Sequence, residues 1–271
     1  MRKWIGVVGL TALSMLAGLS CDDGVGTEEP EFCIDTLIDD MEGGGKQATS
    51  GGYWFVTQDG KADGDIIYTG DPTTDNSHID YPALADGFSY WDLSTDPAHP
   101  GESGHCIYLK GTIGGRVNYP YIAVGVNLTV AKCNLDLSHL TEVSFRARGK
   151  GRWRMKFKTQ AADDWAVSKG YDPGKADFAY SFTAAIDSVN WSDITVPVEL
   201  FQGTTSEFRH DMDSLGITIT EALAATYQIQ FQTDGYKGST AGNDGGTEVW
   251  LQLDDIVFDY DSTTTPGACC Q

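Results

Sequence analysis

Short runs of alternating apolar and polar residues recur along the chain, separated by Gly, Asp, Pro and Asn. Such alternation places every second side chain on the same face of a β-strand. The pattern predicts strands at 36–42, 52–58, 104–111, 121–130, 141–148, 152–159, 178–186, 192–198, 225–233 and 247–260. Many short strands at this spacing predict an all-β fold, an antiparallel β-sandwich or barrel.

Helical periodicity is scarce, and only 220–225 is expected to form a helical turn. Segments 136–140 and 199–203 are predicted to be short connectors. The stretch from Gly60 to Ser103 is predicted to be a long loop, although it contains the segment GFSYWDL. Loops of this length are usually functional or mobile.

Basic side chains occupy every second position of the segment RARGKGRWRMKFK, residues 146–158. The GKG at 149–151 predicts a tight turn between two strands, because glycine adopts the positive φ that such turns need. One strand face then buries Phe145, Trp153, Met155 and Phe157 in the core. The other face presents a positive stripe on one outer sheet surface, formed by Arg146, Arg148, Lys150, Arg152, Arg154, Lys156 and Lys158.

The N-terminal residues have the pattern of an export signal. A short basic start precedes an apolar stretch that is too short to span a bilayer, which predicts a signal peptide at 1–20. The segment LAGLSC resembles a lipoprotein cleavage site, which predicts a lipid anchor on Cys21 and an exported, surface-anchored protein; a plain secreted protein is the alternative. An acidic tether at 21–34, a β-sandwich domain at 35–261 and a C-terminal tail at 262–271 follow.

Charge and cysteine content narrow the class of protein. The chain has 39 acidic and 18 basic residues and a formal net charge of −21, which argues against nucleic acid as a partner. Export implies an oxidising compartment, so disulfides are expected. With Cys21 set aside, an odd number of cysteines remains. A Cys106–Cys133 bond is predicted, as is a bond from Cys33 to Cys269 or Cys270, although sequence does not fix the connectivity.

Four motifs in order resemble a known fold. They are LIDDMEGG near the start, LDLSHLTEVSFRARGKGRWRMKFKT in the middle, and then WSDITVPVELF and VWLQLDDIVF. Together they resemble the galactose-binding-domain-like jelly roll that includes family 11 carbohydrate-binding modules, and they are also similar to the complex I intermediate-associated protein family. The resemblance implies a β jelly roll that binds polysaccharide or cell-wall glycan and often holds a structural calcium ion.

The resemblance also implies where calcium would bind. Glu42 on the opening strand and Asp254 or Asp255 on the closing strand match positions that hold Ca²⁺ in similar modules. Calcium prefers six to eight oxygen ligands, and backbone carbonyls would have to supply some of them. The alternative is that these carboxylates lie in solvent at strand ends.

Candidate glycan-binding residues are of three kinds. Tyr53, Trp54, Tyr90 and Trp91 offer aromatic platforms, although any one of them has core packing as its alternative. Gln228, Gln230 and Gln232 share one strand face, and their amides both donate and accept hydrogen bonds. Arg154 and Lys156 are predicted to join this row in a polar trough, where they would select an anionic glycan or else balance acidic neighbours.

The sequence contains no recognised catalytic motif, neither a nucleophile elbow nor a paired zinc-binding histidine motif nor a phosphate-binding loop. The expected function is therefore non-catalytic binding of polysaccharide. A structural or adhesion module that binds protein is one alternative. A polysaccharide lyase that uses Arg154, Lys156, His105 and a tyrosine is another.

Overall fold

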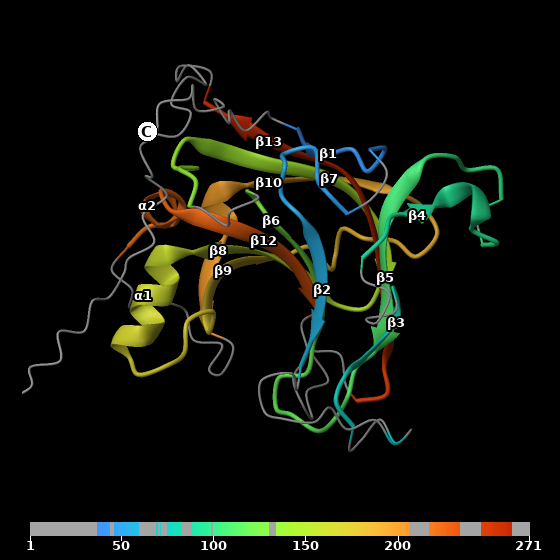
Figure 1. Cartoon of the computed structure of the whole chain (residues 1–271), viewed down its shortest axis with the longest axis horizontal. Coiled ribbons are helices and arrows are strands. Elements are labelled where there is room, and N and C mark those ends of the chain that lie inside the picture. The colour runs from blue at the N-terminus through green and yellow to red at the C-terminus, as the bar shows by residue number, and fades with distance from the viewer. Residues whose placement is uncertain are drawn as a thin grey trace, which may run out of the picture. The chain divides into compact units, whose positions relative to one another are not determined.

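Two antiparallel sheets form the fold in the computed structural model (Figure 1). The structure describes residues 37–43, 46–59, 69, 71, 75–82, 88–98, 100–129, 134–205, 217–233 and 245–261. All of them belong to one unit of the chain, Glu31–Gln271.

The first sheet has seven strands, in the order β10-β7-β13-β5-β3, with β1 paired to β13 and β4 paired to β5. Their bounds are β1 Leu37–Asp39, β3 His78–Tyr81, β4 Trp91–Asp92, β5 His105–Thr112, β7 Leu140–Lys150, β10 Ser192–Pro197 and β13 Glu248–Tyr260. The last strand, β13, therefore lies in the interior of the sheet, between β5 and β7.

The second sheet contains, in the part of the chain that the structure describes, six strands in the order β11-β9-β8-β12-β6-β2. Their bounds are β2 Trp54–Gln58, β6 Ile122–Asn127, β8 Trp153–Thr159, β9 Ala176–Ser181, β11 Gln202–Thr205 and β12 Thr226–Thr233. Strands β8 and β12 lie in its middle and have neighbours on both sides.

The strand order is that of a jelly roll. Strands β5, β13, β7 and β10 lie side by side in one sheet, and β6, β12, β8 and β9 lie side by side in the other. Strands that follow one another in the chain thus fall mostly in opposite sheets, as two interlocked Greek keys require. The predicted antiparallel β-sandwich with a jelly-roll arrangement is confirmed, and each predicted strand has a counterpart in the structure.

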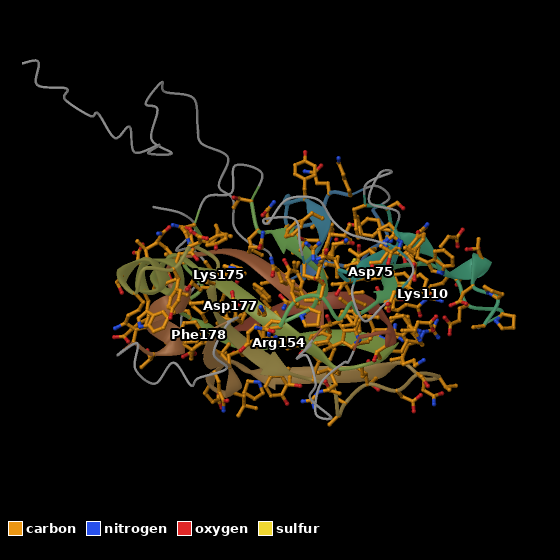
Figure 2. The ribbon with its side chains drawn as sticks, turned by 90° about the horizontal axis from the view of Figure 1, so that it is seen from below. Asp75, Lys110, Arg154, Lys175, Asp177 and Phe178 are labelled. Carbon is orange, nitrogen blue, oxygen red and sulfur yellow. The ribbon has the colours of Figure 1, made fainter. Side chains whose placement is uncertain are left out.

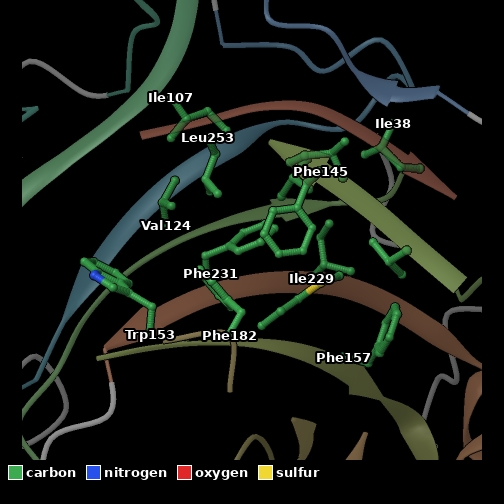
Figure 3. Close-up of a cluster of buried hydrophobic side chains, with 14 of the residues drawn as sticks. Ile38, Ile107, Val124, Phe145, Trp153, Phe157, Phe182, Ile229, Phe231 and Leu253 are labelled. Atoms are coloured by element: carbon green, nitrogen blue, oxygen red, sulfur yellow. The ribbon is translucent and has the colours of Figure 1, made fainter. Parts of the chain in front are cut away.

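The core lies between the sheets (Figure 3). Phe145 of β7 meets Phe231 of β12 edge to face, with ring centroids 5.3 Å apart, so the contact joins the two sheets. Trp153, Met155 and Phe157 are fully buried, as their alternation in β8 predicted. Burial of each such side chain stabilises the fold by about 1.5–3 kcal/mol.

The basic segment 146–158 turns a corner between the sheets. Strand β7 belongs to the seven-stranded sheet and β8 to the six-stranded sheet, so the two do not form the predicted hairpin. Gly151 has a φ of 105°, which a side chain would oppose, and the Trp153 indole N–H donates to the Lys150 carbonyl across the bend. The predicted turn at 149–151 is placed later by the structure, because Gly149 and Lys150 still belong to β7 and the bend falls at Gly151. The prediction of one continuous basic surface was wrong.

Among the described residues, helices α1 and α2 accompany the six-stranded sheet. Helix α2, Ile219–Leu223, is the predicted helical turn and starts with a capping box between Thr218 and Glu221. Helix α1, Gln160–Ser168, was not predicted. Thr159 ends β8 and caps α1 by accepting a hydrogen bond from the Ala162 N–H, so one residue both closes the strand and starts the helix.

The stretch from Gly60 to Ser103 is more ordered than predicted in the part that the structure describes. It contributes β3 and β4 to the seven-stranded sheet, followed by a short 3-10 turn at Leu93–Thr95. The alternation was missed because β4 has only two residues, Trp91 and Asp92, which pair with Cys106 and His105 of β5. These strands extend the sheet at its β5 edge.

Candidate functional site

The outward face of the six-stranded sheet carries a two-dimensional array of polar side chains. We call this array the polar face and define it by Asn127, Arg154, Lys156, Gln228, Gln230 and Gln232. The register pairs Gln228 with Lys158, Gln230 with Lys156 and Gln232 with Arg154, and Gln228 faces Asn127 on the other side. The alternating residues Ile229 and Phe231 are fully buried, so the predicted glutamine row is confirmed as one strand face.

The amides on this face are bonded to one another. Gln230 donates from Nε2 to Gln228 Oε1 over 2.7 Å, and Gln228 donates from Nε2 to Asn127 Oδ1 over 2.9 Å. Each amide has more donors and acceptors than this chain of bonds uses, so hydrogen-bonding capacity remains for a ligand. These two hydrogen bonds fix the orientation of the amides before any ligand binds. Asn127 was not predicted, although its place at the end of an alternating run pointed to this face.

Two aromatic side chains, Phe55 of β2 and Tyr53 just before it, border these amides. Phe55 is half-buried and pairs with Gly125 of β6, which in turn pairs with Gln230. A side chain at Gly125 would meet the Phe55 ring at 2.7 Å and the Gln230 side chain at 2.9 Å, so the missing Cβ lets both lie over β6. Tyr53 is 38% exposed and has the same strand parity as Phe55.

The sequence analysis chose Trp54 as a ligand-binding aromatic residue and did not name Phe55. Trp54 is 2% exposed and donates from Nε1 to the buried Asp39 carboxylate over 2.6 Å. Tyr90 is 9% exposed, and its hydroxyl donates to the same carboxylate over 2.6 Å. Burial and the Asp39 carboxylate both raise the pKa of Tyr90. Trp54 and Tyr90 are therefore core residues around a buried acid, and the prediction that they contact a ligand was wrong.

Trp91 belongs to the other sheet. It packs against Tyr81 and Tyr108 with ring centroids 4.9 and 5.1 Å away, and Tyr108 also approaches Trp250 at 6.4 Å. Tyr108 is outward on β5, where it alternates with the fully buried Ile107 and Leu109. Trp91 therefore does not share a face with the glutamine row.

Lys156 is not available for a ligand. It is 3% exposed and donates from Nζ to Asp177 Oδ2 of β9 over 2.7 Å, while Lys158 pairs with the other oxygen of the same carboxylate. Burial lowers the pKa of Lys156 to about 7 against the opposing pull of Asp177. Burial alone would raise the pKa of Asp177, but the two ammonium groups outweigh it and hold the pKa at about 2. Gln232 is also buried, at 8% exposed.

Arg154 is the basic residue of the polar face that stays half-exposed (Figure 2). Its cross-strand neighbours are Ser181 on β9 and Gln232 on β12, neither of which carries charge. Arg154 and the amides Gln228 and Gln230 are thus brought together on one face, as the sequence predicted.

The basic residues of β7 lie on the opposite side of the sandwich. Arg148 is fully buried, binds Glu102 with two hydrogen bonds of 2.8 and 2.9 Å, and stacks on Trp191 at 4.7 Å. Arg146 reaches Asp193, Asp254 and Asp255 at distances of 3.5 to 3.6 Å. Lys150 lies 4.0 Å from Glu248. Arg148 ties the segment that carries Glu102 to the seven-stranded sheet, whereas Arg146 and Lys150 link neighbouring strands within that sheet.

The residues predicted to bind calcium fit the ion poorly. The Arg146 guanidinium lies 3.6 Å from both Asp254 and Asp255, where it takes the place of a cation. Glu42 accepts a hydrogen bond from the His105 N–H over 2.9 Å. Burial, followed by the charge of Asp255, raises the pKa of Asp254 to about 6. Within the described ranges, no group of three or more His, Cys, Asp or Glu side chains is placed to hold a metal ion.

The side chains considered for a lyase are not assembled. His105 lies on β5 beside Glu42, with His105 Nδ1 3.5 Å from the carboxylate. Arg154 and Lys156 lie on β8, in the other sheet. The imidazole and the two cations therefore do not share a face.

Cys106 carries a free thiol, so the prediction of a Cys106–Cys133 disulfide was wrong. Cys106 alternates with the inward-facing Ile107, is fully buried, and has a raised pKa because burial disfavours the thiolate. Cys21, Cys33, Cys133, Cys269 and Cys270 lie outside the described residues. No helix among the described residues is long and apolar enough to cross a membrane.

Comparisons with known proteins return matches at the level of structure. No family model and no curated protein matches the chain. The chain is similar to the family 11 carbohydrate-binding module of the cellulosomal cellulase Lic26A-Cel5E of Clostridium thermocellum, with 17% identity over 83% of this chain and 94% of that one and a TM-score of 0.45. It is also similar to the family 30 module of the cellulase Cel9D-Cel44B of the same organism, with 11% identity over 84% and 98% of the two chains and a TM-score of 0.43.

These scores describe a distant likeness, so the case for a function rests on the residues of this chain. The solved structures include the carbohydrate-binding family that the sequence motifs resemble. The likeness to the complex I intermediate-associated family remains a resemblance of sequence motifs.

Proposed function

We propose that this protein binds a polysaccharide chain on the polar face and does not transform it chemically. The observation that carries the proposal is the bonded row Asn127–Gln228–Gln230 beside the aromatic side chains Phe55 and Tyr53. Sugar rings present apolar faces that pack on aromatic rings and hydroxyl groups that pair with amides. Both partners occur side by side here, and Phe55 and the amides come from strands rather than from loops, which favours a fixed geometry.

The position of the polar face supports an extended ligand. Its residues come from β6, β8 and β12, which are adjacent strands about 4.8 Å apart. A linear chain that crosses them would meet Phe55, then Gln230 and then Arg154, the half-exposed polar-face residue of β8. The buried Lys156–Asp177 pair beneath this path stiffens the surface without offering it free charge.

Affinity electrophoresis tests the proposal. We expect the purified protein to be retarded in gels that contain one of four polymers: mixed-linkage β-glucan, xylan, pectate or alginate. The double variant Gln228→Ala/Gln230→Ala should lose this retardation. The control Gln160→Ala removes an exposed glutamine from α1, so it should migrate like the unchanged protein. Unretarded migration in every gel would refute glycan binding and leave a protein-binding module as the better description.

We propose further that the protein is exported and held at a membrane through a lipid on Cys21. The support is the order of a basic start, an apolar stretch and a cysteine, followed by an acidic segment. Mass spectrometry of the mature N-terminus tests this, because a lipidated Cys21 adds acyl mass that Cys21→Ala would lack. Detection of residues 1–20 in the mature protein would refute it.

A further inference from the structure

We propose that the ligand of the polar face is an acidic glycan, whose carboxylate or sulfate group is bound by Arg154. This inference rests on the proposed function and names the chemical class of its ligand. The starting observation is which basic residues of this acidic protein have a carboxylate partner and which do not.

Basic residues on the alternation are matched by acids elsewhere in the sheets. Arg146 has three aspartates within 3.6 Å, Arg148 has Glu102 at 2.8 Å, and Lys156 and Lys158 share Asp177. In the parts of the chain that the structure describes, Arg154 has no carboxylate partner. This is unexpected in a chain with 39 acidic and 18 basic residues.

The surroundings of Arg154 leave its charge uncompensated. Its Nε is buried and has no hydrogen-bond acceptor, although the side chain is only half-buried. The two cross-strand neighbours, Ser181 and Gln232, are uncharged. A buried donor without an acceptor destabilises the folded state, and a guanidinium does not lose its proton to relieve this. The side chain as a whole is only half-buried, so the rest of its guanidinium group is open to an anionic ligand.

The neighbouring cluster does not compensate the charge of Arg154. Lys156 and Lys158 share one carboxylate, so the three groups carry one net positive charge when Lys156 is protonated and no net charge when it is neutral. Arg154 and Lys158 each contribute to lowering the pKa of Lys156, after burial, which is the largest cause. The cluster therefore supplies no negative charge to Arg154, which favours an anion from a ligand at this position.

The position of Arg154 suits a group carried by a sugar in the amide row. Arg154 lies two residues along β8 from Lys156, which pairs with Gln230, a separation of about 7 Å. A sugar bound over Gln230 can therefore place a charged substituent near Arg154. The planar guanidinium matches the two oxygens of a carboxylate or sulfate with parallel hydrogen bonds.

The test measures binding of acidic and neutral glycans by the protein and two variants, Arg154→Ala and Arg154→Lys. Polygalacturonate supplies carboxylates, chondroitin sulfate adds sulfate groups, and carboxyl-reduced pectate and β-glucan are the neutral counterparts. Titrations near 0.15 M salt, where the Debye length is about 8 Å, screen distant acidic residues but leave direct contacts. Arg146→Ala is the matched control, because Arg146 lies on the opposite side of the sandwich at 41% exposure.

We expect the acidic glycan to bind at least about tenfold more tightly than its neutral counterpart, and Arg154→Ala to remove that advantage. Arg154→Lys should recover part of it, because a lysine keeps the charge but not the paired geometry. Arg146→Ala should bind like the unchanged protein. Polygalacturonate and chondroitin sulfate distinguish which anion Arg154 prefers.

Two different failures would be distinguishable. In the first, neutral and acidic glycans bind equally tightly, and this binding is lost in Gln228→Ala/Gln230→Ala but unaffected in Arg154→Ala. That result would overturn the acidic ligand and keep the proposed function. No binding of any glycan by the unchanged protein would overturn both. Far-ultraviolet circular dichroism and a urea midpoint for each variant separate lost binding from lost folding.

Discussion

Replacement of Asp177 by asparagine should strongly destabilise the protein, because it removes the carboxylate between two buried ammonium groups. Asp177 and Lys156 are 1% and 3% exposed, and the charged atoms are 2.7 Å apart. Two unit charges at this distance attract by about 6 kcal/mol at an effective dielectric constant of 20. Part of this is offset because asparagine is easier to desolvate and Lys156 can lose its proton, so we expect a net loss of about 3–5 kcal/mol.

The loss should depend on pH, with a sign set by Lys156. The pKa of Lys156 is about 7 in the folded protein, against 10.5 ordinarily, so above pH 7 its amine is mostly neutral and attracts Asp177 less. Removal of Asp177 is therefore less harmful at pH 9 than at pH 6. In the unchanged protein, the low pKa of Lys156 makes the free energy of unfolding rise between pH 7 and 10.5.

Urea denaturation followed by tryptophan fluorescence at pH 6 and pH 9 measures both effects. The control is Asp193→Asn, which removes a 90% exposed partner of Arg146 and should change the free energy of unfolding by less than about 1 kcal/mol. Equal destabilisation by the two variants, or a larger loss at pH 9 than at pH 6, would refute the reasoning. A thermal scan should give a fall in melting temperature of roughly 6 to 20 °C for Asp177→Asn.

Other features of the structure give further expectations. Phe231→Ala should lower the free energy of unfolding by about 3–5 kcal/mol in urea, because Phe231 is fully buried between the sheets; a loss below 1 kcal/mol, roughly, would contradict its placement. Cys106 should resist a thiol reagent in the folded protein and react once urea unfolds it, since burial raises its pKa; fast labelling of the native protein would count against this. A chelator should leave the melting temperature unchanged, because Arg146 fills the position between Asp254 and Asp255; a fall reversed by added Ca²⁺ would restore the calcium prediction.

The sequence predicted the strands well because apolar and polar residues alternate in them, and burial follows that alternation along β5, β7 and β10. Strand β12 shows the same alternation. The structure confirms that Ile229 and Phe231 face the core and that Gln228 and Gln230 lie on the opposite face. Short elements carry too few residues for a pattern to emerge, so β4 was missed, and α1 was missed because its cap, Thr159, also reads as the last residue of a strand.

The basic residues at 146–158 show which structural information a local sequence pattern lacks. Alternation reports which side of a strand a residue occupies, but it does not report which sheet the strand joins. Arg146 and Arg154 obey the same alternation and lie on opposite sides of the sandwich, because the chain changes sheets at Gly151. Likewise, the type of an aromatic residue did not separate the buried Trp54 from the exposed Tyr53, whereas strand parity in β2 does.

The place of β13 has a consequence for how the chain acquires its structure. This strand is the last one in sequence among the described residues, and yet it hydrogen-bonds to β1, β5 and β7 in the interior of its sheet. Leu37 pairs with Val257, so the two ends of the domain are joined late, after closure of a very long loop. A nascent or truncated chain without β13 would expose two open strand edges, on β5 and β7. The domain should therefore fold slowly and only when it is complete.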